Sequence, residues 1–576
     1  MNKELLIIPL ALLYFFLQYS CNTANSTSYS DIARDSATIE RDKTAFQKNC
    51  SNCHSFRYES IGPQLGGITT QVSRDWLYHF IKDPRKMIES GDGRSKALQH
   101  KYKSVMPTLA ISDEEIGEII SYLHTRQKPV VKKNSDGKQG IEDPIPDTIQ
   151  MSDLVVDLEF VKQIPSSSIN GKKPLARINK LSFAQNVNGL FIVDLHGKLY
   201  KLKNNQLSIY MDLPQLSPHF ISDPGQGTGF GSFVFHPNFS KNGLLYTTHT
   251  ESAGSGNADF RLPDSIKVAL QWVLTEWKAN NPAADQFQGT HRELLRADMP
   301  SVMHGFQELE FNSNAKKGSK DYGKLYLGIG DGGSVDVGFS FLPHSPERIL
   351  GSIIRVDPAG SNSKNGRYGI PSDNPSISYK GEPLLKEVYA YGFRNPHRIS
   401  WNKAGQMIVS NIGQSKIESV NIVLPGNDFG WPFREGSFLL DPDGDVEKVY
   451  PLPANDSIYH FSYPIAQYDH KGKGYSAISG GYQYSGSAVP ALKGKYFFGD
   501  IHSGKLYYID MSEVKEDSRT GIKEWQVSFD GKKTTLSTLC EQERTDLRFG
   551  IDAEGEIYIM TKTDGNIYKM NKVLSK

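Results

Sequence analysis

The sequence is poor in cysteine, in excess charge of either sign and in long apolar segments. Four cysteines in 576 residues argue against a disulfide-rich scaffold. The 65 basic and 64 acidic side chains give a net charge of +1, which favours neither a nucleic acid nor a strongly acidic partner. One apolar run, residues 5–17, is shorter than the roughly 20 residues of a spanning helix. Composition therefore does not indicate a class of binding partner.

The short apolar run has the features of an export signal. Lys3 precedes it, and the small polar residues NTANSTS follow Cys21. This order resembles a lipoprotein signal cleaved before a lipidated cysteine, although Gln18 replaces the usual leucine. We expect residues 1–21 to be a signal peptide and the chain to be lipid-anchored at Cys21 in a bacterial periplasm or cell envelope. Simple cleavage and a retained anchor are the alternatives.

Glycine, proline and tyrosine are abundant. The 52 Gly, 30 Pro and 28 Tyr are typical of a turn-rich β protein. At roughly 100–200 residues per domain the chain is long enough for two or more domains. We therefore expect a multidomain protein with a large all-β part.

Residues 50–54 read CSNCH, the pattern for covalent haem attachment. The thiols of Cys50 and Cys53 bond the porphyrin, and His54 ligates the iron. Zinc would need a second pair of ligands, which the sequence does not offer. The motif therefore predicts haem c.

The distal iron ligand is expected to be Met106, which Pro107 follows. Axial ligation by a methionine and a histidine raises the reduction potential of the haem and leaves no open coordination position on the iron. This haem would therefore transfer electrons. Met87 and His79 lie on or near a helix expected over residues 74–86, which makes them weaker candidates. The alternatives are Met87, His79, His100 and His124.

Apolar residues on both sides of the motif have helical spacing. Ser112 and Glu115 form a capping box at the start of the last helix. Residues 42–127 resemble a class I cytochrome c, and the polar segments 22–41 and 128–154 are expected to be linkers. The expected core positions of the first and last helices are Phe46, Ile116, Ile119, Ile120 and Leu123.

Beyond the second linker one pattern recurs: an apolar strand, a polar turn with glycine, and a second strand with an aromatic residue. It is clearest at residues 190–202, 495–509 and 556–570, and weaker copies bring the units to some six. A six-bladed β-propeller over residues 155–573 closes such a repeat without a long exposed edge. A pair of β-sandwiches is the weaker alternative.

Several segments of this domain carry a distinctive order of glycine and aromatic residues. They include GSFVFHPNF, ADMPSVMHGFQELEF, YGKLYLGIGDGG, YGFRNPHRISWN and LRFGIDAEGEIYIMT. In these segments the domain resembles the soluble sugar dehydrogenases that depend on PQQ, the glucose/sorbosone dehydrogenase family. The resemblance implies a tricyclic quinone bound over the propeller axis with Ca²⁺, and oxidation of an aldose sugar or related alcohol.

The resemblance also implies catalytic roles. His304 would take the hydroxyl proton of the sugar as hydride passes to the quinone, a role for a group that titrates near neutrality. Asp331 would orient His304 and stabilise its cationic form. Arg394 would lie at the reactive carbonyl of the quinone, where charge develops.

Further residues would bind the cofactors. Asn395 and Arg548 would contact the quinone, since a guanidinium suits its carboxylate. Gln226 lies near a glutamine of the family's cofactor site, with a local match that slips by one position. Backbone carbonyls of Gly413 and Gln414 would hold the calcium ion.

Some positions depart from the family pattern. Met303 and residues 305–307 alter the loop around the expected base. Ser485 stands where Lys or Arg often meets the cofactor, and Glu418-Ser419 stands where paired acids often bind a second calcium ion. An insertion over residues 251–288 contains SIKVALQWVLTEW, whose apolar residues predict a lid or docking helix near the substrate entrance or the haem domain.

Two functions agree with these features. In the first, a sugar or related alcohol is oxidised at PQQ, and electrons pass singly to the tethered haem and then to a downstream cytochrome or oxidase. In the second, the propeller is a non-enzymatic binding module, as in the hedgehog-interacting proteins, which share the same signature. The joint presence of His304, Asp331 and Arg394 favours the enzyme.

Overall fold

The structure is a computed structural model. It describes residues 36–50, 54–56, 62–102, 106–109, 111–127, 139–168, 171, 173–224, 227–471, 476–515 and 519–574. Residues 1–21, Cys53 and Gln226, for which functions are predicted above, lie outside the described residues. Within the described ranges no helix has the length and apolar character needed to cross a membrane.

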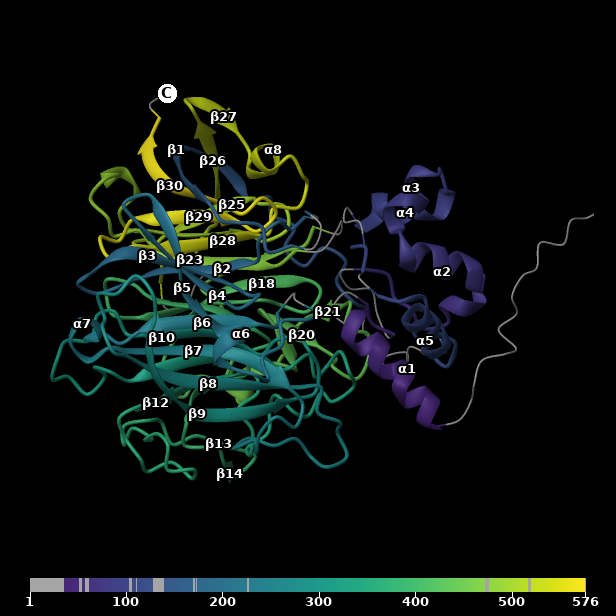
Figure 1. Ribbon diagram of the computed structural model, residues 1–576, viewed down its shortest axis with the longest axis horizontal. Coiled ribbons are helices and arrows are strands. Elements are labelled where there is room, and N and C mark those ends of the chain that lie inside the picture. The colour runs from purple at the N-terminus through teal and green to yellow at the C-terminus, as the bar shows by residue number, and fades with distance from the viewer. Residues whose placement is uncertain are drawn as a thin grey trace, which may run out of the picture.

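The N-terminal domain is helical (Figure 1). Helices α1 and α5 pack against each other and bury the five apolar side chains expected at their contact. The capping box between Ser112 and Glu115 is present at the start of α5. The helices are α1 (Ser36–Asn49), α2 (Arg74–Lys82), α3 (Pro84–Glu89), α4 (Gly93–Tyr102) and α5 (Asp113–His124), with a 3-10 turn at Ile68–Thr70.

The single helix expected over residues 74–86 is wrong, because the structure has α2 and α3 there. Asp83 ends α2 and caps α3, since its side chain accepts a hydrogen bond from the N–H of Lys86 at 3.1 Å. Pro84 occupies the first turn of α3, where no N–H is needed. Pro84 therefore divides the segment into two helices, although its apolar residues keep helical spacing throughout.

The second domain is the predicted six-bladed β-propeller, and each blade has four antiparallel strands. The first blade is β2 (Ile178–Ala184), β3 (Val187–Asp194), β4 (Lys198–Lys203) and β5 (Gln206–Asp212). The second is β6 (Phe230–Phe235), β7 (Leu244–Ser252), β8 (Leu270–Ala279) and β9 (Gly289–Met299). The third is β10 (Phe306–Phe311), β11 (Leu325–Ile329), β12 (Ser352–Val356) and β15 (Val388–Tyr391).

The remaining blades complete the ring. The fourth is β16 (Pro396–Trp401), β17 (Met407–Asn411), β18 (Ile417–Val423) and β22 (Ala466–Asp469). The fifth is β23 (Ile478–Gln483), β24 (Lys495–Asp500), β25 (Leu506–Asp510) and β26 (Lys523–Phe529), and the sixth is β28 (Leu547–Ile551), β29 (Ile557–Thr561), β30 (Asn566–Val573) and β1 (Gln150–Gln163). The inner strands β2, β6, β10, β16, β23 and β28 contact one another in a closed ring.

Short elements decorate the blades. The helices are α6 (Leu213–Leu216), α7 (Phe239–Asn242) and α8 (Leu536–Cys540), with 3-10 turns at Asp456–Tyr459 and Pro490–Leu492. The additional strands are β13 (Ser378–Tyr379), β14 (Glu382–Pro383), β19 (Arg434–Glu435), β20 (Phe438–Leu440), β21 (Val449–Tyr450) and β27 (Lys532–Thr534). The clearest repeats in the sequence are the hairpins β3–β4, β24–β25 and β29–β30.

Strand β1 closes the propeller. It is antiparallel to β30, with Val156 opposite Val573, and it also pairs in parallel with β26 of the fifth blade. The two ends of the domain thereby complete one blade.

The lid or docking helix expected within residues 251–288 is wrong. Strand β8 occupies this segment and pairs with β7 and β9. All its residues except Lys278 are buried. Both faces of β8 are buried, so apolar residues occur on both faces of the strand and some of them fall at helical spacing without a helix. Residues 253–269, ahead of β8, form a loop.

A buried ion cluster lies among the inner strands. Lys180 on β2 and Arg398 on β16 both pair with Glu308 on β10, and all three side chains are fully buried. Lys180 Nζ also lies 2.7 Å from Glu310 Oε1. The cluster joins three blades at the axis of the propeller.

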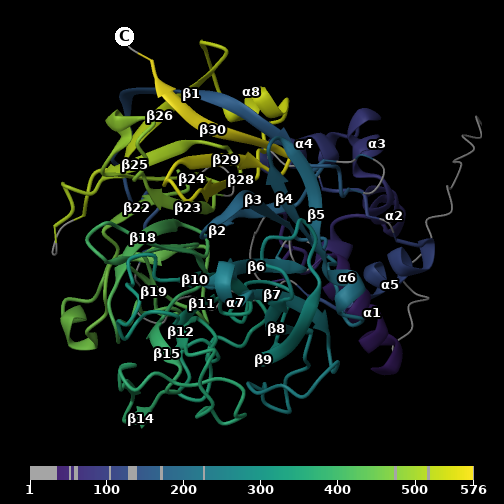
Figure 2. The ribbon, with the colours of Figure 1, turned by 60° about the vertical axis from the view of Figure 1, so that its left-hand side comes forward.

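The helical domain lies at one side of the propeller in both views (Figures 1 and 2). The described linker residues are fixed to the propeller. The N–H of Ile141 donates to the carbonyl of Val449 at 2.9 Å, and the N–H of Ile145 donates to Asp469 at 3.2 Å. Residues 139–149 therefore follow the propeller surface into β1.

Candidate functional site

One cavity of about 1190 Å³ is lined by both domains. The helical domain contributes His54 and Met106, and the propeller contributes His304, Arg394 and Arg548. The histidine of the haem-attachment motif and the candidate catalytic histidine therefore face the same space.

His54 has the surroundings of an iron ligand. Its Nδ1 lies 2.9 Å from the carbonyl oxygen of Pro63, so a proton on Nδ1 donates there and Nε2 is left for a metal. Burial lowers the pKa of His54, which favours the neutral ring that metals bind. A Cβ on Gly62 would collide with the His54 ring. Glycine at this position therefore lets the ring lie where it does.

The distal candidates are not equally placed. Met106 and His100 line the cavity, whereas the other three do not. His100 is exposed, and Met106 packs against the core of the helical domain. Met106 therefore keeps the best position for the predicted role. The candidates outside the cavity lining are Met87, His79 and His124.

The cavity wall on the helical side fits a covalently attached haem. Cys50 is buried just after α1, and apolar side chains from α2 to the loop of Met106 form the wall. Thioether attachment at Cys50 would hold the macrocycle against this wall. The apolar lining residues include Phe80, Ile88, Leu98 and Leu109.

His304 is held by Asp331. Its backbone, between β9 and β10, has a φ of 50°, and its Nδ1 lies 2.8 Å from Asp331 Oδ1. The carboxylate of Asp331 also accepts hydrogen bonds from the N–H of Gly333 at 2.8 Å and from Trp431 Nε1 at 3.1 Å. The carboxylate is thus fixed, and it fixes the ring with Nε2 left for a ligand.

The electrostatics keep His304 neutral. Burial lowers its pKa, and the cation of Arg394 lowers it further, while Asp331 opposes both effects. A neutral imidazole at neutral pH is the state that a general base requires.

Arg394 is oriented by two partners. Its Nε donates to Gln414 Oε1 at 2.8 Å, and Gln414 Nε2 donates to Asp336 Oδ1 at 2.8 Å. The carbonyl of Arg394 accepts the N–H of Asp331 at 2.8 Å. The loop of Arg394 is thereby connected to the carboxylate that holds His304.

Buried cations crowd one wall of the cavity. Burial lowers the pKa of Arg548, Arg398 and Arg544 act in the same direction and Asp546 opposes them, and together they bring the pKa to about 9. Burial and the nearby Arg548 hold the pKa of Lys562 well below its usual value. An anion bound beside such a group would relieve the repulsion.

Among the described residues of the cavity wall, the buried atoms Asn395 Oδ1 and His397 Nδ1 have no hydrogen-bond partner. An unsatisfied buried polar atom costs about 1–3 kcal/mol, so each is suited to meet a ligand or water. A proton on His397 Nδ1 can be donated to an anionic oxygen, and Asn395 Oδ1 can accept from an N–H group, so with the neighbouring cations they fit a ligand such as PQQ, which carries carboxylates and an N–H.

The structure leaves the calcium ligands untested. Gly413 and Gln414 lie beside Arg394, but in the described ranges no group of three or more His, Cys, Asp or Glu side chains could hold a metal ion. Glu418 is fully buried, its Oε1 lies 2.9 Å from His470 Nε2, and burial raises its pKa. A calcium site therefore stays a prediction based on backbone carbonyls.

The expected place of Ser485 is wrong. Strand β23 starts next to Ala477, which lines the cavity, and runs away from it, so that Ser485 lies past its far end. There the Oγ of Ser485 fills the space of a Cβ on Gly555. Ser485 is therefore not among the residues that line the cavity.

Sequence reasoning missed several cavity residues. His397 follows Arg394-Asn395 by two positions and could have been found there, whereas Trp272 was hidden in the apolar run of β8. Cβ atoms on Gly231 or Gly305 would collide with the indole of Trp272, so both glycines admit it to the wall. The missed residues are Trp272, Asp336, His397, His502 and Lys562.

Comparison with known proteins identifies both domains. Residues 175–569, more than half of the chain, match the glucose/sorbosone dehydrogenase family. The chain belongs to this family. Residues 39–127 match cytochrome c. The protein is thus a glucose/sorbosone dehydrogenase domain preceded by a cytochrome c domain.

The curated relatives are distant. HIPL1 protein of Arabidopsis thaliana is 26% identical over 343 residues, which are 54% of this chain and 46% of that protein. Quinoprotein glucose dehydrogenase B of Acinetobacter calcoaceticus is 25% identical over 342 residues, 55% of this chain and 64% of that protein. The chain therefore spans about half to two thirds of these relatives.

A solved structure shares the fold of this glucose/sorbosone dehydrogenase domain. The apo-form of the soluble aldose sugar dehydrogenase from Escherichia coli superposes with a TM-score of 0.50 at 18% identity. The aligned region covers 72% of this chain and 98% of the Escherichia coli chain. The match shows the fold of the propeller.

Proposed function

We propose that the protein is a quinoprotein dehydrogenase that oxidises an aldose sugar or a related alcohol at PQQ and passes the electrons to its own haem c. The observation that carries this proposal is the shared cavity, in which His54 and Met106 face the space of His304 and Arg394. Membership of the glucose/sorbosone dehydrogenase family and the similarity to quinoprotein glucose dehydrogenase B of Acinetobacter calcoaceticus support a quinone cofactor.

The residues of the cavity suit the proton chemistry of this reaction. Neutral His304 would accept the proton of the substrate hydroxyl at Nε2, and Asp331 would stabilise the resulting imidazolium through Nδ1. Arg394, held by Gln414, would provide a cation where negative charge develops on an oxygen. Bound in the cavity, the quinone would accept hydride and the haem would take electrons one at a time.

Cofactor binding is assigned to residues on both sides. Arg548, Asn395 and His397 would meet the quinone, and Gln226, which lies outside the described residues, remains a candidate. Backbone carbonyls of Gly413 and Gln414 would hold Ca²⁺. Cys50, Cys53, His54 and Met106 would hold the haem, whose electrons go on to a downstream acceptor.

The test uses the full-length oxidised haem protein loaded with PQQ and Ca²⁺. A panel of aldoses and alcohols is added while haem absorbance is followed in a stopped-flow instrument. We expect at least one sugar to reduce the haem, and His304→Ala to abolish this while a chemical reductant still reduces the haem. If PQQ binds and no substrate reduces either the haem or an added dye, the proposal fails.

A further inference from the structure

The contact between the two domains is polar. Lys267 Nζ, in the loop of residues 253–269, lies 3.3 Å from Thr44 Oγ1 on α1. In the part of the chain that the structure describes, each hydrophobic cluster belongs to one domain. An interface without a shared apolar core is typical of domains that associate reversibly.

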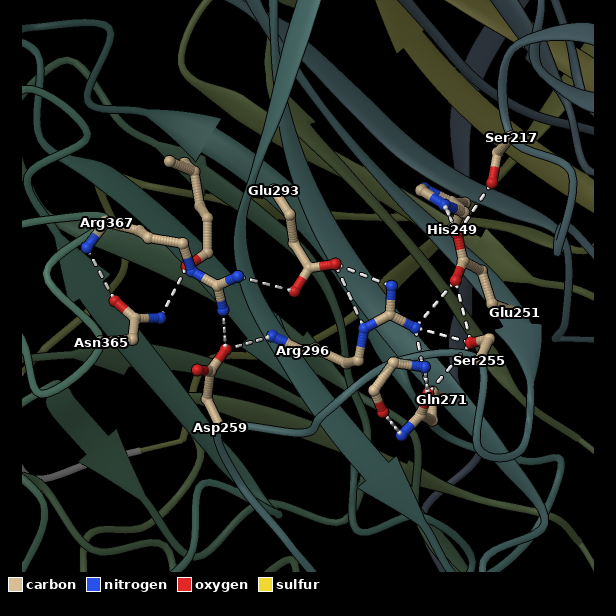
Figure 3. A network of polar contacts seen from close by, with 12 residues as sticks. Ser217, His249, Glu251, Ser255, Asp259, Gln271, Glu293, Arg296, Asn365 and Arg367 are labelled. Carbon is tan, nitrogen blue, oxygen red and sulfur yellow. Dashed lines mark hydrogen bonds and ion pairs between the residues drawn. The ribbon is translucent and has the colours of Figure 1, made fainter.

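The loop that carries Lys267 is firmly anchored. A network around the buried Arg296 of β9 connects it to three strands (Figure 3). Arg296 Nη1 donates to Glu251 at 2.8 Å and to Ser255 at 2.7 Å, and its backbone N–H donates to Asp259 at 2.8 Å. These hydrogen bonds therefore hold the loop in a defined conformation.

This anchored loop adjoins the candidate site on two sides. Strand β9 runs on from Arg296 toward His304, and the loop leads into β8, where Trp272 lines the cavity. Leu262 and Ile266 of the loop are buried in the propeller core. The loop that contacts α1 is therefore held by the same part of the propeller, strands β8 and β9, that positions His304.

Charged residues of both domains also line another part of the cavity wall. Glu541 and Glu543, just after α8, line the cavity together with Arg85 of α3 and Lys96 of α4, and all four side chains are exposed. In Figures 1 and 2, α4 lies on the side of the propeller that carries α8. Opposite charges on facing surfaces attract, and salt screens them beyond about 8–10 Å.

We propose that these two regions form a reversible docking surface that holds the haem crevice over the propeller mouth. The inference rests on the proposed function. Residues 253–269 receive α1, with Arg296 as the positioning residue, and Glu541 and Glu543 attract the basic side chains of α3 and α4. In the docked state the haem faces the cavity, and release exposes the haem to the downstream acceptor.

The first test is independent of catalysis. Hydrogen exchange of α1 and of residues 253–269 is measured in the full-length haem protein without PQQ or sugar. We expect Lys267→Glu, and separately the double variant Glu541→Lys/Glu543→Lys, to increase exchange of α1 severalfold. Adding Arg85→Glu/Lys96→Glu to the double variant should restore protection. The exposed Lys241 on α7 provides a matched control, Lys241→Glu, with no effect.

The second test measures electron transfer. With a substrate that reduces the haem, Lys267→Glu should slow haem reduction about tenfold or more, while reduction of a small dye stays unchanged. Raising the salt from about 0.02 M to 0.5 M should slow the wild type in the same sense. Arg296→Gln should slow haem reduction, and Arg296→Lys should restore part of the rate.

The outcomes are separable. If hydrogen exchange and its dependence on salt are the same in the wild type, Lys267→Glu and Glu541→Lys/Glu543→Lys, the docking surface is refuted. If no substrate reduces haem or dye, the proposed function fails, and hydrogen exchange still decides whether the docking surface exists.

Discussion

Asp331 holds His304 through a 2.8 Å hydrogen bond to Nδ1 while Trp431 and the backbone of Gly333 hold Asp331 in turn. The ring can therefore present only Nε2 to the cavity. In Asp331→Asn the amide can instead donate to Nδ1 and stabilise the wrong tautomer. We expect kcat/KM with a dye acceptor to fall by about 10²–10⁴ with little change in haem content.

A double variant is the control for Asp331. Residues that act as a unit have non-additive effects. His304→Ala combined with Asp331→Asn should therefore be about as slow as His304→Ala alone. Multiplied losses in the double variant would contradict the pairing.

The pH profile should report on His304. Burial and Arg394 lower the pKa of His304 below its usual 6.5, so kcat/KM should be flat at neutral pH and fall only at a pH more acidic than the pKa of an ordinary histidine. Arg394→Gln removes the neighbouring cation and should move the acidic limb to higher pH, in addition to lowering the rate. An acidic limb that stays in place would mean that another group titrates.

The distal ligand can be tested by potentiometry. Methionine ligation raises the potential of a haem, so Met106→His should lower the reduction potential markedly. His100 also lines the cavity, and His100→Ala should leave the potential nearly unchanged. The opposite pattern would assign the ligand to His100.

Glu310 should make stability depend on pH. Burial raises its pKa to about 7 in the folded protein, above its usual 4.5, so the folded state binds the proton more tightly. The stabilisation is present below pH 4.5 and is lost as the pH rises to about 7. The free energy of unfolding of the wild type, relative to Glu310→Gln, should fall by up to about 3 kcal/mol across this range. Denaturant titrations at several pH values measure this, and a constant difference would contradict the shift.

Much of the fold follows from the sequence because the signals are local. The hairpins that form blades and the capping box of α5 depend on residues close together in the chain. The break at Pro84 shows the limit of this prediction, because apolar spacing alone does not reveal that a proline begins a new helix. β8 shows a second limit, because the cover on both its faces comes from neighbouring blades.

Only part of the candidate site could be predicted from the sequence. His304, Asp331 and Arg394 were named through the family resemblance, and the structure places them together. The place of Ser485 depends on strand direction, and the shared cavity depends on the docking of two domains. Neither property is encoded in the spacing of residues along one segment.

Strand β1 also constrains the order of events in biogenesis. Val156 must wait for Val573, near the opposite end of the chain, before the sixth blade can form. The cytochrome segment, which is contiguous and precedes β1, needs no distant partner for its own core. During synthesis, attachment of the predicted haem can therefore be completed while the propeller is still an open arc with an unpaired edge. The protein would then be most exposed to proteolysis and aggregation in this interval, when only one of its two domains is finished.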